Sequence, residues 1–403
     1  MARNNIGVLT SEECCGCKAC GDCCPKNAIV FRLDGEGFFH PAVDETLCVD
    51  CGRCTKVCPA LNRIQDNDLH IQSFIGCLDK DKARRDTGSS GGIFGLLANH
   101  LLEKGYIVCG AAFDDELKLR HQFAATPEDT ERLKKSKYLQ SDCTGIYKSI
   151  KDRLNRGDKV MFVGTPCQCN ALRNYIGGGN DHLTVIDFAC HGVPSQSLFD
   201  KCLQYYEQKY DCKVTGYSFR YKPKPYGAPQ NFLLHISRNG KESKKCGKYY
   251  EEAFYCGFQK YITLRTSCYS CKWANTRRVS DVTLADFWGI ESVTSKWDRT
   301  DHPSLVILNT SRGQELFDAI KDDTDFIVVD KDDAVKGNGV LTAPTRIPKE
   351  REVFFDDLRT KPFEYVVERH LRLKRRWVKD VYYAIPFAVR KVMLNVIKRI
   401  NHA

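Results

Sequence analysis

The sequence lacks the long apolar segments that membrane-spanning or exported proteins carry. Among its 403 residues no uncharged apolar run approaches the roughly 18 residues that a spanning helix requires. The first residues, MARNNIGVLTSEECC, lack the apolar stretch of an export signal. We therefore expect a cytoplasmic protein, in which most of the 22 cysteines are thiols or metal ligands rather than disulfides.

Three common catalytic signatures are also absent, namely G-x-G-x-x-G, G-x4-G-K-[ST] and H-E-x-x-H. Rossmann, P-loop and zincin sites thereby lose their usual support. The chain also lacks an excess of basic residues spread along its whole length. Most of the formal charge of +10 lies in residues 369–402, where ten Lys or Arg accompany one acid, Asp380. A diffuse surface for nucleic acid is therefore not expected.

Cysteine is instead concentrated in two combs of the form C-x2-C-x2-C-x3-C-P. Such a comb presents thiolates to a cubane iron-sulfur core, and in two-cluster ferredoxins the fourth cysteine of each comb ligates the other cluster. Zinc sites prefer separated C-x2-C pairs, so zinc is disfavoured. We predict two [4Fe-4S] clusters, one bound by Cys14, Cys17, Cys20 and Cys58 and the other by Cys48, Cys51, Cys54 and Cys24.

Residues 1–62 thus resemble a bacterial dicluster ferredoxin, which carries one-electron chemistry. Cys15 and Cys23 fall outside the register of the first comb. We predict that they are unligated thiols.

After a polar linker, residues 70–345 alternate strand-like runs with amphipathic helices, which predicts a larger α/β domain. The helical share falls in the later part, so a mixed sheet (mixed α+β) is expected, and residues 222–229 are predicted to form an exposed loop. The predicted strands include residues 73–78, 106–113, 159–165 and 182–190, and the predicted helices include residues 91–105, 144–157 and 197–210.

More cysteines follow in this second domain. Cys167 and Cys190 each come directly after a predicted strand, and the carboxyl ends of strands in such a sheet face one crevice. With the C-x2-C pair Cys268 and Cys271 they would supply the four thiolates of a third cluster. The alternative from spacing alone is that all four are buried structural cysteines.

Two turns could bind a phosphate. Residues 89–92, SSGG, open a predicted helix, whose free N–H groups and dipole favour an anion, and Thr165 occupies a comparable turn. The alternative is ordinary N-capping by Ser and Thr. The residues alone indicate a phosphate-bearing cofactor without naming it.

At these positions the chain resembles the coenzyme F420 hydrogenase/dehydrogenase β-subunit family, here fused to the ferredoxin module. The resemblance rests on SSGGIFGLLANHLLEKG, SKYLQSD, GDKVMFVGTPCQCNALRNYI, CHGVPS, SCYSCKWA and SDVTLADFWGI, in this order between residues 70 and 310. It implies FAD, and a cluster at Cys167, Cys190, Cys268 and Cys271. The implied flavin site comprises Ser90, Gly91, Gly92, Lys137, Tyr138, Gly164, Thr165 and Gln168. Asp286 and Trp288 match a family segment without an assigned role beyond lining or packing.

The resemblance implies an iron-sulfur, flavin-dependent oxidoreductase that transfers electrons between [4Fe-4S] clusters and a two-electron acceptor. A redox donor such as a ferredoxin or a reductase subunit would be one partner, and a small-molecule hydride acceptor, F420 or another compound, the other. The alternatives are a non-enzymatic electron-relay subunit docked on a membrane or biosynthetic complex, and a zinc-organised binding protein.

The last part of the chain, residues 346–403, is predicted to be a basic helical tail. Ile385, Val389 and Val396 follow helical spacing and are flanked by basic residues such as Arg390 and Lys398. A basic amphipathic helix of this kind suits peripheral contact with the inner face of a membrane. Docking on the protein's own core or on a partner is the alternative.

Overall fold

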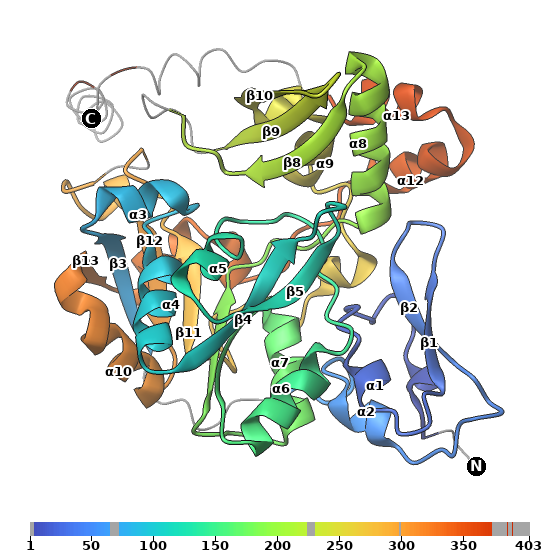
Figure 1. Cartoon of the computed structure of the whole chain (residues 1–403), viewed down its shortest axis with the longest axis horizontal. Helices are drawn as coiled ribbons and strands as arrows, with labels where there is room; N and C mark the ends of the chain where they lie inside the picture. Colours follow the sequence, from blue (N-terminus) through green and yellow to red (C-terminus); the bar gives the residue numbers. More distant parts are fainter. Residues whose placement is uncertain are drawn as a thin grey trace, which may run out of the picture.

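In the computed structural model, the described residues are 4–64, 72–223, 230–297 and 300–372, with the single residues 385 and 389. The centre of the molecule is an eight-stranded sheet in the order β13-β3-β12-β11-β7-β6-β4-β5 (Figure 1). Its strands are β3 (Ser73–Asp79), β4 (Tyr106–Phe113), β5 (Leu119–Ala124), β6 (Lys159–Val163), β7 (Leu183–Phe188), β11 (Val282–Asp286), β12 (Ser304–Leu308) and β13 (Thr324–Val329).

The middle of this sheet is parallel and its margins are antiparallel. β4, β6, β7 and β11 run in the same direction, so their carboxyl ends meet at one edge. β5 pairs antiparallel with β4, while β12, β3 and β13 alternate in direction at the other margin. The predicted mixed α/β fold is therefore confirmed, and residues 164–165 and 189–191 come directly after parallel strands.

Helices cover both faces of the sheet. On one face, α4 (Ile93–Glu103) and α10 (Ser311–Ile320) bury apolar side chains against β4 and β12. On the other, α6 (Ile146–Asn155) and α7 (Pro166–Ile176) pack against β6 and β7. Local sequence sets where α7 begins, since Thr165 and Gln168 form a capping box around Pro166 in the first turn.

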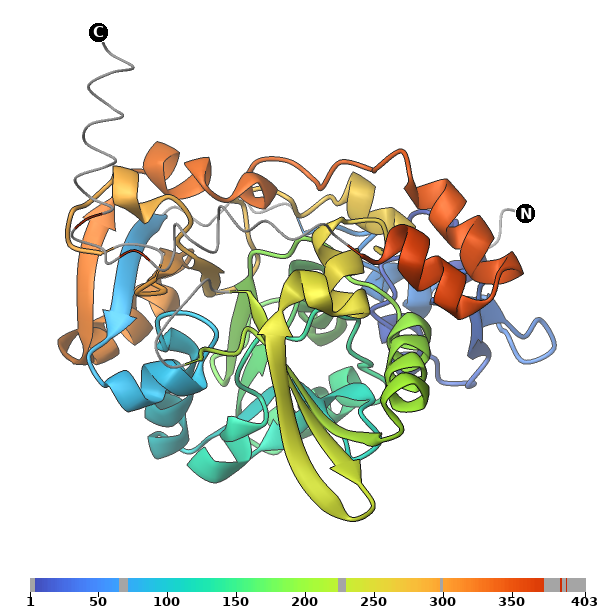
Figure 2. The same ribbon diagram turned by 90° about the horizontal axis from the view of Figure 1, so that it is seen from above.

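A second, antiparallel sheet lies beside the first (Figures 1 and 2). Its core is rich in aromatic side chains. It consists of β8 (Lys213–Phe219), β9 (Asn231–Arg238) and β10 (Lys241–Lys248). The helices around it are α8 (Gln196–Tyr210), α9 (Ala253–Gln259), α12 (Arg351–Thr360) and α13 (Phe363–His370). Phe199, Phe254 and Phe354 are completely buried there, so this sheet and its helices share one packed interior.

The two cysteine combs of the N-terminal domain have the same loop conformation. Its elements are α1 (Ala19–Asp22), α2 (Arg53–Val57), β1 (Ile29–Leu33) and β2 (Phe39–Val43). Gly16 and Lys18 in the first comb have positive φ angles of 67° and 68°, and Asp50 and Gly52 at the same places in the second have 52° and 72°. Both combs therefore follow the same backbone path, and α1 and α2 pack on α6 and α7 of the large domain.

The shorter elements connect these layers. They are η1 (Ile6–Val8), α3 (Lys82–Thr87), α5 (Pro127–Glu131), η2 (Tyr249–Glu251), η3 (Thr266–Ser270), η4 (Ile290–Ser292), η5 (Lys321–Asp323), α11 (Lys331–Lys336) and η6 (Gly339–Leu341).

The described part of the predicted tail, residues 346–372, forms α12 and α13. Phe355, Val366, Val367 and Leu371 bury their side chains in the aromatic core, so these two helices are continuous with the packing of residues 196–264. The predicted amphipathic helix lies outside the described residues, apart from Ile385 and Val389, as does most of the predicted loop 222–229. Within the described ranges, no helix is both long and apolar enough to cross a bilayer.

Candidate functional site

Cys48, Cys51 and Cys54 of the second comb lie together with Cys24 of the first comb in the N-terminal domain. Cys24, Cys48, Cys51 and Cys54 line one small cavity, which brings together the four residues of the second predicted cluster. Backbone N–H of Ala28 donates to Cys24 Sγ at 3.3 Å, and Asn5 Nδ2 donates to Cys48 Sγ at 3.7 Å. Cys51 is exposed to solvent, so this set, called here the outer set, faces the surface.

The other predicted set, Cys14, Cys17, Cys20 and Cys58, is buried between the outer set and the large domain, and is called here the inner set. Burial raises the pKa of Cys20 well above its usual value, and the neighbouring Cys14 and Cys58 raise it further. The crossed assignment thus brings Cys58 of the second comb to the first, as the two-cluster pattern requires.

Cys14 differs from the other inner thiols in its electrostatic surroundings. Burial raises its pKa, but a hydrogen bond with His40 and the positive charge of Arg265 lower it to below the usual value. A lowered thiol pKa favours the thiolate, which is the form that ligates iron.

The third predicted set, Cys167, Cys190, Cys268 and Cys271, lines a single cavity of about 40 Å³ and is called here the third set. Cys167 follows β6, Cys190 follows β7, and the other two come from η3 and the residue after it. Burial raises the pKa of Cys190 well above its usual value, and Cys268 and Cys167 add to this effect. The four thiols are half-buried around one cavity, and a cationic iron core there would favour their thiolate forms against the opposing effect of burial.

No three of the described His, Cys, Asp and Glu side chains converge tightly enough for a single metal ion. The four sulfurs of a cubane surround an inorganic core rather than one ion. All three sets have the donor chemistry that such a core requires, and the ligand assignments remain predictions.

A larger cavity of about 320 Å³ opens where the parallel strands end. Of the eight predicted flavin residues, Gly91 is not on its wall. The backbone N–H of Gly91 donates to Ser304 Oγ at 2.9 Å, and a Cβ atom there would lie 2.6 Å from the Cys77 carbonyl oxygen. The other seven line the cavity: Ser90, Gly92, Lys137, Tyr138, Gly164, Thr165 and Gln168.

Several of these side chains form hydrogen bonds with other residues of the chain. Lys137 Nζ donates to the carbonyls of Arg132 and Leu133 at 3.0 and 2.8 Å, and burial lowers the pKa of this lysine to about 7. Gln168 accepts a hydrogen bond from the backbone N–H of Thr165 at 3.0 Å. They therefore shape the cavity wall.

The amino end of α4 gives the cavity its anion-binding character. Gly92 caps this helix with a φ of +88°, and the first residues of the helix line the cavity. Lys134 and Lys135 lie on the same wall. A helix amino end with basic neighbours favours a phosphate group.

An ion pair on the wall of the large cavity was not predicted from the sequence. Arg220, buried, donates to Asp286 Oδ1 at 2.9 Å, to Tyr138 Oη at 3.3 Å and to the Ser89 carbonyl at 3.2 Å. Burial opposes ionisation of Asp286, but Arg220 holds the pKa of that carboxyl below its usual value. Asp286 is thus an ionised partner of Arg220, and Trp288 lies under the guanidinium at 5.5 Å.

The cavity of the third set and the larger cavity are adjacent. Cys190, together with Thr165 and Gln168, lines both of them. A group bound in the large cavity would therefore lie beside Cys190, a residue of the third set.

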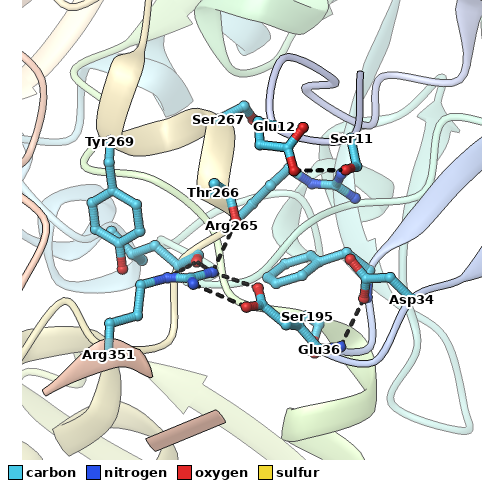
Figure 3. Close-up of polar contacts among 12 residues, drawn as sticks. Ser11, Glu12, Asp34, Glu36, Ser195, Arg265, Thr266, Ser267, Tyr269 and Arg351 are labelled. Carbon is cyan, nitrogen blue, oxygen red and sulfur yellow. Dashed lines mark hydrogen bonds and ion pairs between the residues drawn. The ribbon is translucent and has the colours of Figure 1, made fainter. Parts of the chain in front are cut away.

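Two buried arginines connect the N-terminal domain to the large domain (Figure 3). Arg265 donates to the carbonyls of Cys14 and Phe39 at 3.1 and 3.0 Å. Arg351 donates to Glu36 Oε1 at 2.9 Å and to the Leu264 carbonyl at 3.0 Å. These contacts fix the inner set relative to the third set.

Comparison with known proteins gives two family matches. Residues 157–334 match the family of the C terminus of the coenzyme F420 hydrogenase/dehydrogenase beta subunit. Residues 13–62 match a 4Fe-4S dicluster domain. The predicted iron-sulfur domain is therefore confirmed.

The curated relatives cover parts of the chain. A subunit of the F(420)H(2) dehydrogenase of Methanosarcina mazei is 25% identical over 190 residues, which are 44% of this chain and 53% of that protein. The coenzyme F420-dependent sulfite reductase of Methanocaldococcus jannaschii is 28% identical over 167 residues, covering 41% of this chain and 26% of that one. The chain thus spans about half, or less, of the length of these relatives.

The ferredoxin-type protein NapF of Haemophilus influenzae is 45% identical over 53 residues, which are 13% of this chain and 30% of the NapF chain. A solved chain of the F420-reducing [NiFe] hydrogenase complex of Methanosarcina barkeri is aligned over 78% of this chain and 100% of its own, at a TM-score of 0.43 and 15% identity. The chain therefore carries, over residues 157–334, a domain that matches the C terminus of the coenzyme F420 hydrogenase/dehydrogenase beta subunit, and a 4Fe-4S dicluster domain precedes it.

Proposed function

We propose that this protein is an iron-sulfur flavoprotein oxidoreductase, with FAD in the large cavity and a [4Fe-4S] cluster at each of the three cysteine sets. The observation that carries the proposal is the position of Cys190 on the walls of both the large cavity and the third set. Electrons would pass between the outer, inner and third sets and the large cavity. When bound, FAD would exchange single electrons with a cluster and a hydride with a substrate.

The residues of the chain would bind and orient the flavin. The amino end of α4, with Lys134 and Lys135, would hold its phosphates. Phe188 ends β7 on the cavity wall with 38% of its surface exposed, which suits contact with an aromatic ring.

We further propose that the two-electron acceptor is F420 or another small hydride acceptor. The names of both F420-related relatives support this choice. The name of the first relative describes a subunit, which supports a protein partner such as a ferredoxin or a reductase subunit as the electron donor. We place the protein in the cytoplasm, with contact to a membrane surface through residues 373–403.

Cofactor analysis tests the proposal. The full chain, purified without oxygen, is expected to release about one FAD and to hold iron and acid-labile sulfide for three clusters. Phe188→Ala should weaken FAD binding by about two- to tenfold, since an aromatic contact contributes roughly 0.5–1.5 kcal/mol. The matched control is Val328→Ala on β13, because Val328 is 72% exposed and is not on the cavity wall. Equal loss of FAD in both variants would contradict the assignment of the large cavity.

The same measurement tests the second candidate, an electron-relay subunit without its own chemistry. The name of the Methanosarcina mazei relative as a dehydrogenase subunit favours this candidate. Three clusters without flavin, even after incubation with FAD, would establish relay and refute the flavoenzyme.

A further inference from the structure

Arg278 brings a positive charge to the cavity of the third set. Only 2% of its surface is exposed, so it is buried in the large domain. Among the described residues that line this cavity, Arg278 is the one whose side chain is permanently charged. The cavity that brings together the four predicted cysteine ligands therefore has a buried cation on its wall.

The guanidinium of Arg278 has N–H groups that the described part of the chain leaves unpaired. Neither Nε nor Nη1 has a hydrogen-bond partner among the described residues. Asp187 Oδ2 lies 3.9 Å from Nη1, which is an ion-pair distance but too long for a hydrogen bond. Because burying unpaired donors costs free energy, an acceptor is expected beside this guanidinium.

The other buried arginines differ from Arg278 in this respect. Arg220, Arg265 and Arg351 donate to Asp286 Oδ1, the Cys14 carbonyl and Glu36 Oε1 at 2.9, 3.1 and 2.9 Å. Their donors are used within the protein, whereas the unpaired donors of Arg278 are available to a bound group.

The backbone on both sides of Arg278 is held by hydrogen bonds from the large domain. Gln72 Nε2 donates to the Thr276 carbonyl at 2.5 Å, and Arg173 Nε donates to the Val279 carbonyl at 3.2 Å. The position of Arg278 beside the cavity is therefore set by the fold, whether or not a group is bound there.

A [4Fe-4S] cluster at the third set has the charge that this arginine would compensate. The thiolates of such a cluster outweigh the positive charge of its inorganic core, so the whole is an anion, and reduction makes it more negative. Burial of an anion is costly unless a cation or hydrogen-bond donors accompany it. Arginine stays protonated when buried, and its planar set of N–H groups suits an anionic acceptor.

We propose, as an inference that rests on the proposed third cluster, that Arg278 is the counter-charge of this cluster and donates hydrogen bonds to its sulfur atoms. A cation and N–H donors stabilise the reduced state more than the oxidised state, so Arg278 raises the reduction potential of the cluster. Because Cys190 lines both cavities, Arg278 favours an electron on the cluster that lies beside the large cavity.

The test compares Arg278→Met, Arg278→Lys and Arg277→Met with the unmodified full chain, all prepared without oxygen. Arg277→Met is the matched control, since it removes the same charge from the neighbouring residue, which is exposed and does not line the third cavity. Iron and sulfide are counted first, and midpoint potentials are then measured by redox titration followed by electron paramagnetic resonance. The signal that is lost in Cys271→Ser identifies the third cluster.

We expect Arg278→Met to make reduction of the third cluster about tenfold less favourable, which is a shift of about 59 mV to more negative potential for one electron. Arg278→Lys keeps the charge and should shift the potential less. Arg277→Met should leave it unchanged, because solvent screens an exposed charge. An unchanged potential in Arg278→Met, or an equal shift in Arg277→Met, would overturn the inference.

The iron counts keep the test decisive if the third cluster is not retained in Arg278→Met. Loss of about four irons in Arg278→Met, with full iron in Arg278→Lys, would support the inference, because the retained charge distinguishes these two variants. Equal loss in both variants would make Arg278 a packing residue and overturn the inference.

The counts on the unmodified chain separate this inference from the proposed function. Iron for only two clusters would refute the third cluster, on which both depend. Three clusters without FAD would refute the flavoenzyme and leave the potential of Arg278→Met decisive for its own question. Three clusters with FAD and an unchanged potential in Arg278→Met would refute this inference alone.

Discussion

Replacing Arg265 with alanine should loosen the seating of the N-terminal domain. Its side chain is 2% exposed, and its guanidinium donates to Cys14, Phe39 and the Oε1 atom of Gln140, the last at 2.9 Å. The guanidinium also lies over the Phe38 ring at 4.7 Å. Alanine would leave three acceptors without this donor and open a space between the domains.

The expected cost follows from these contacts. A hydrogen bond from a charged donor contributes about 1.5–3 kcal/mol, and losses at one group are not additive. We therefore expect Arg265→Ala to lower the free energy of unfolding by about 3–5 kcal/mol, within the range for breaking a buried charged group's contacts. Arg265→Lys keeps the charge with fewer suitably placed donors and should cost less.

Urea unfolding followed by visible absorption of the clusters measures this effect. The matched control is Arg156→Ala, because Arg156 has a 61% exposed side chain that pairs with Asp158 at 3.5 Å. Exposed pairs contribute about 0–1 kcal/mol. If Arg265→Ala unfolds at the same urea concentration as Arg156→Ala, the proposed role of Arg265 in joining the domains is refuted.

Three further predictions concern acid stability, the third set and the tail. Burial lowers the pKa of His121 to about 4, so its folded form binds fewer protons than the unfolded form, and the stability present above pH 6.5 should fall as the pH drops from about 6.5 to 4. His121→Gln should flatten that decline by up to about 3 kcal/mol in urea unfolding, and an unchanged pH slope would contradict the cause. Cys271→Ser should lower iron by about four per chain while the electron paramagnetic resonance signals of the dicluster domain remain, and full iron content would remove Cys271 from the ligands. A chain ending at Arg372 keeps α13 intact and should lose flotation with anionic vesicles, whereas equal flotation of both chains would exclude the tail as a membrane contact.

The features that the sequence predicts well are those with a local pattern. The combs identify the dicluster domain because the spacing of four cysteines and a proline is contained in a dozen residues. The strands at residues 73–79 and 106–113 follow from short β-rich runs, and the predicted mixed sheet is confirmed. The resemblance in segments such as CHGVPS predicts the family whose model matches residues 157–334.

Features made by distant pairs have no such pattern. Arg265 and Cys14 are 251 positions apart, and Arg220 and Asp286 are 66 apart, so neither contact leaves a signal in one segment. The sequence does not distinguish helices α12 and α13 from the basic tail that follows them. Their apolar residues, such as Phe354 and Val366, occur in short runs within a charged stretch.

The exposed position of Cys51 sets the order in which air would damage the protein. Molecular oxygen arrives from solvent, so an iron core at the outer set would be attacked before the buried inner set. Partial oxidation would then remove the cluster nearest the surface, where the proposed electron donor would meet the protein, while the interior stays intact. Aerobically handled samples are therefore expected to keep their buried clusters while electron transfer from the proposed donor is lost.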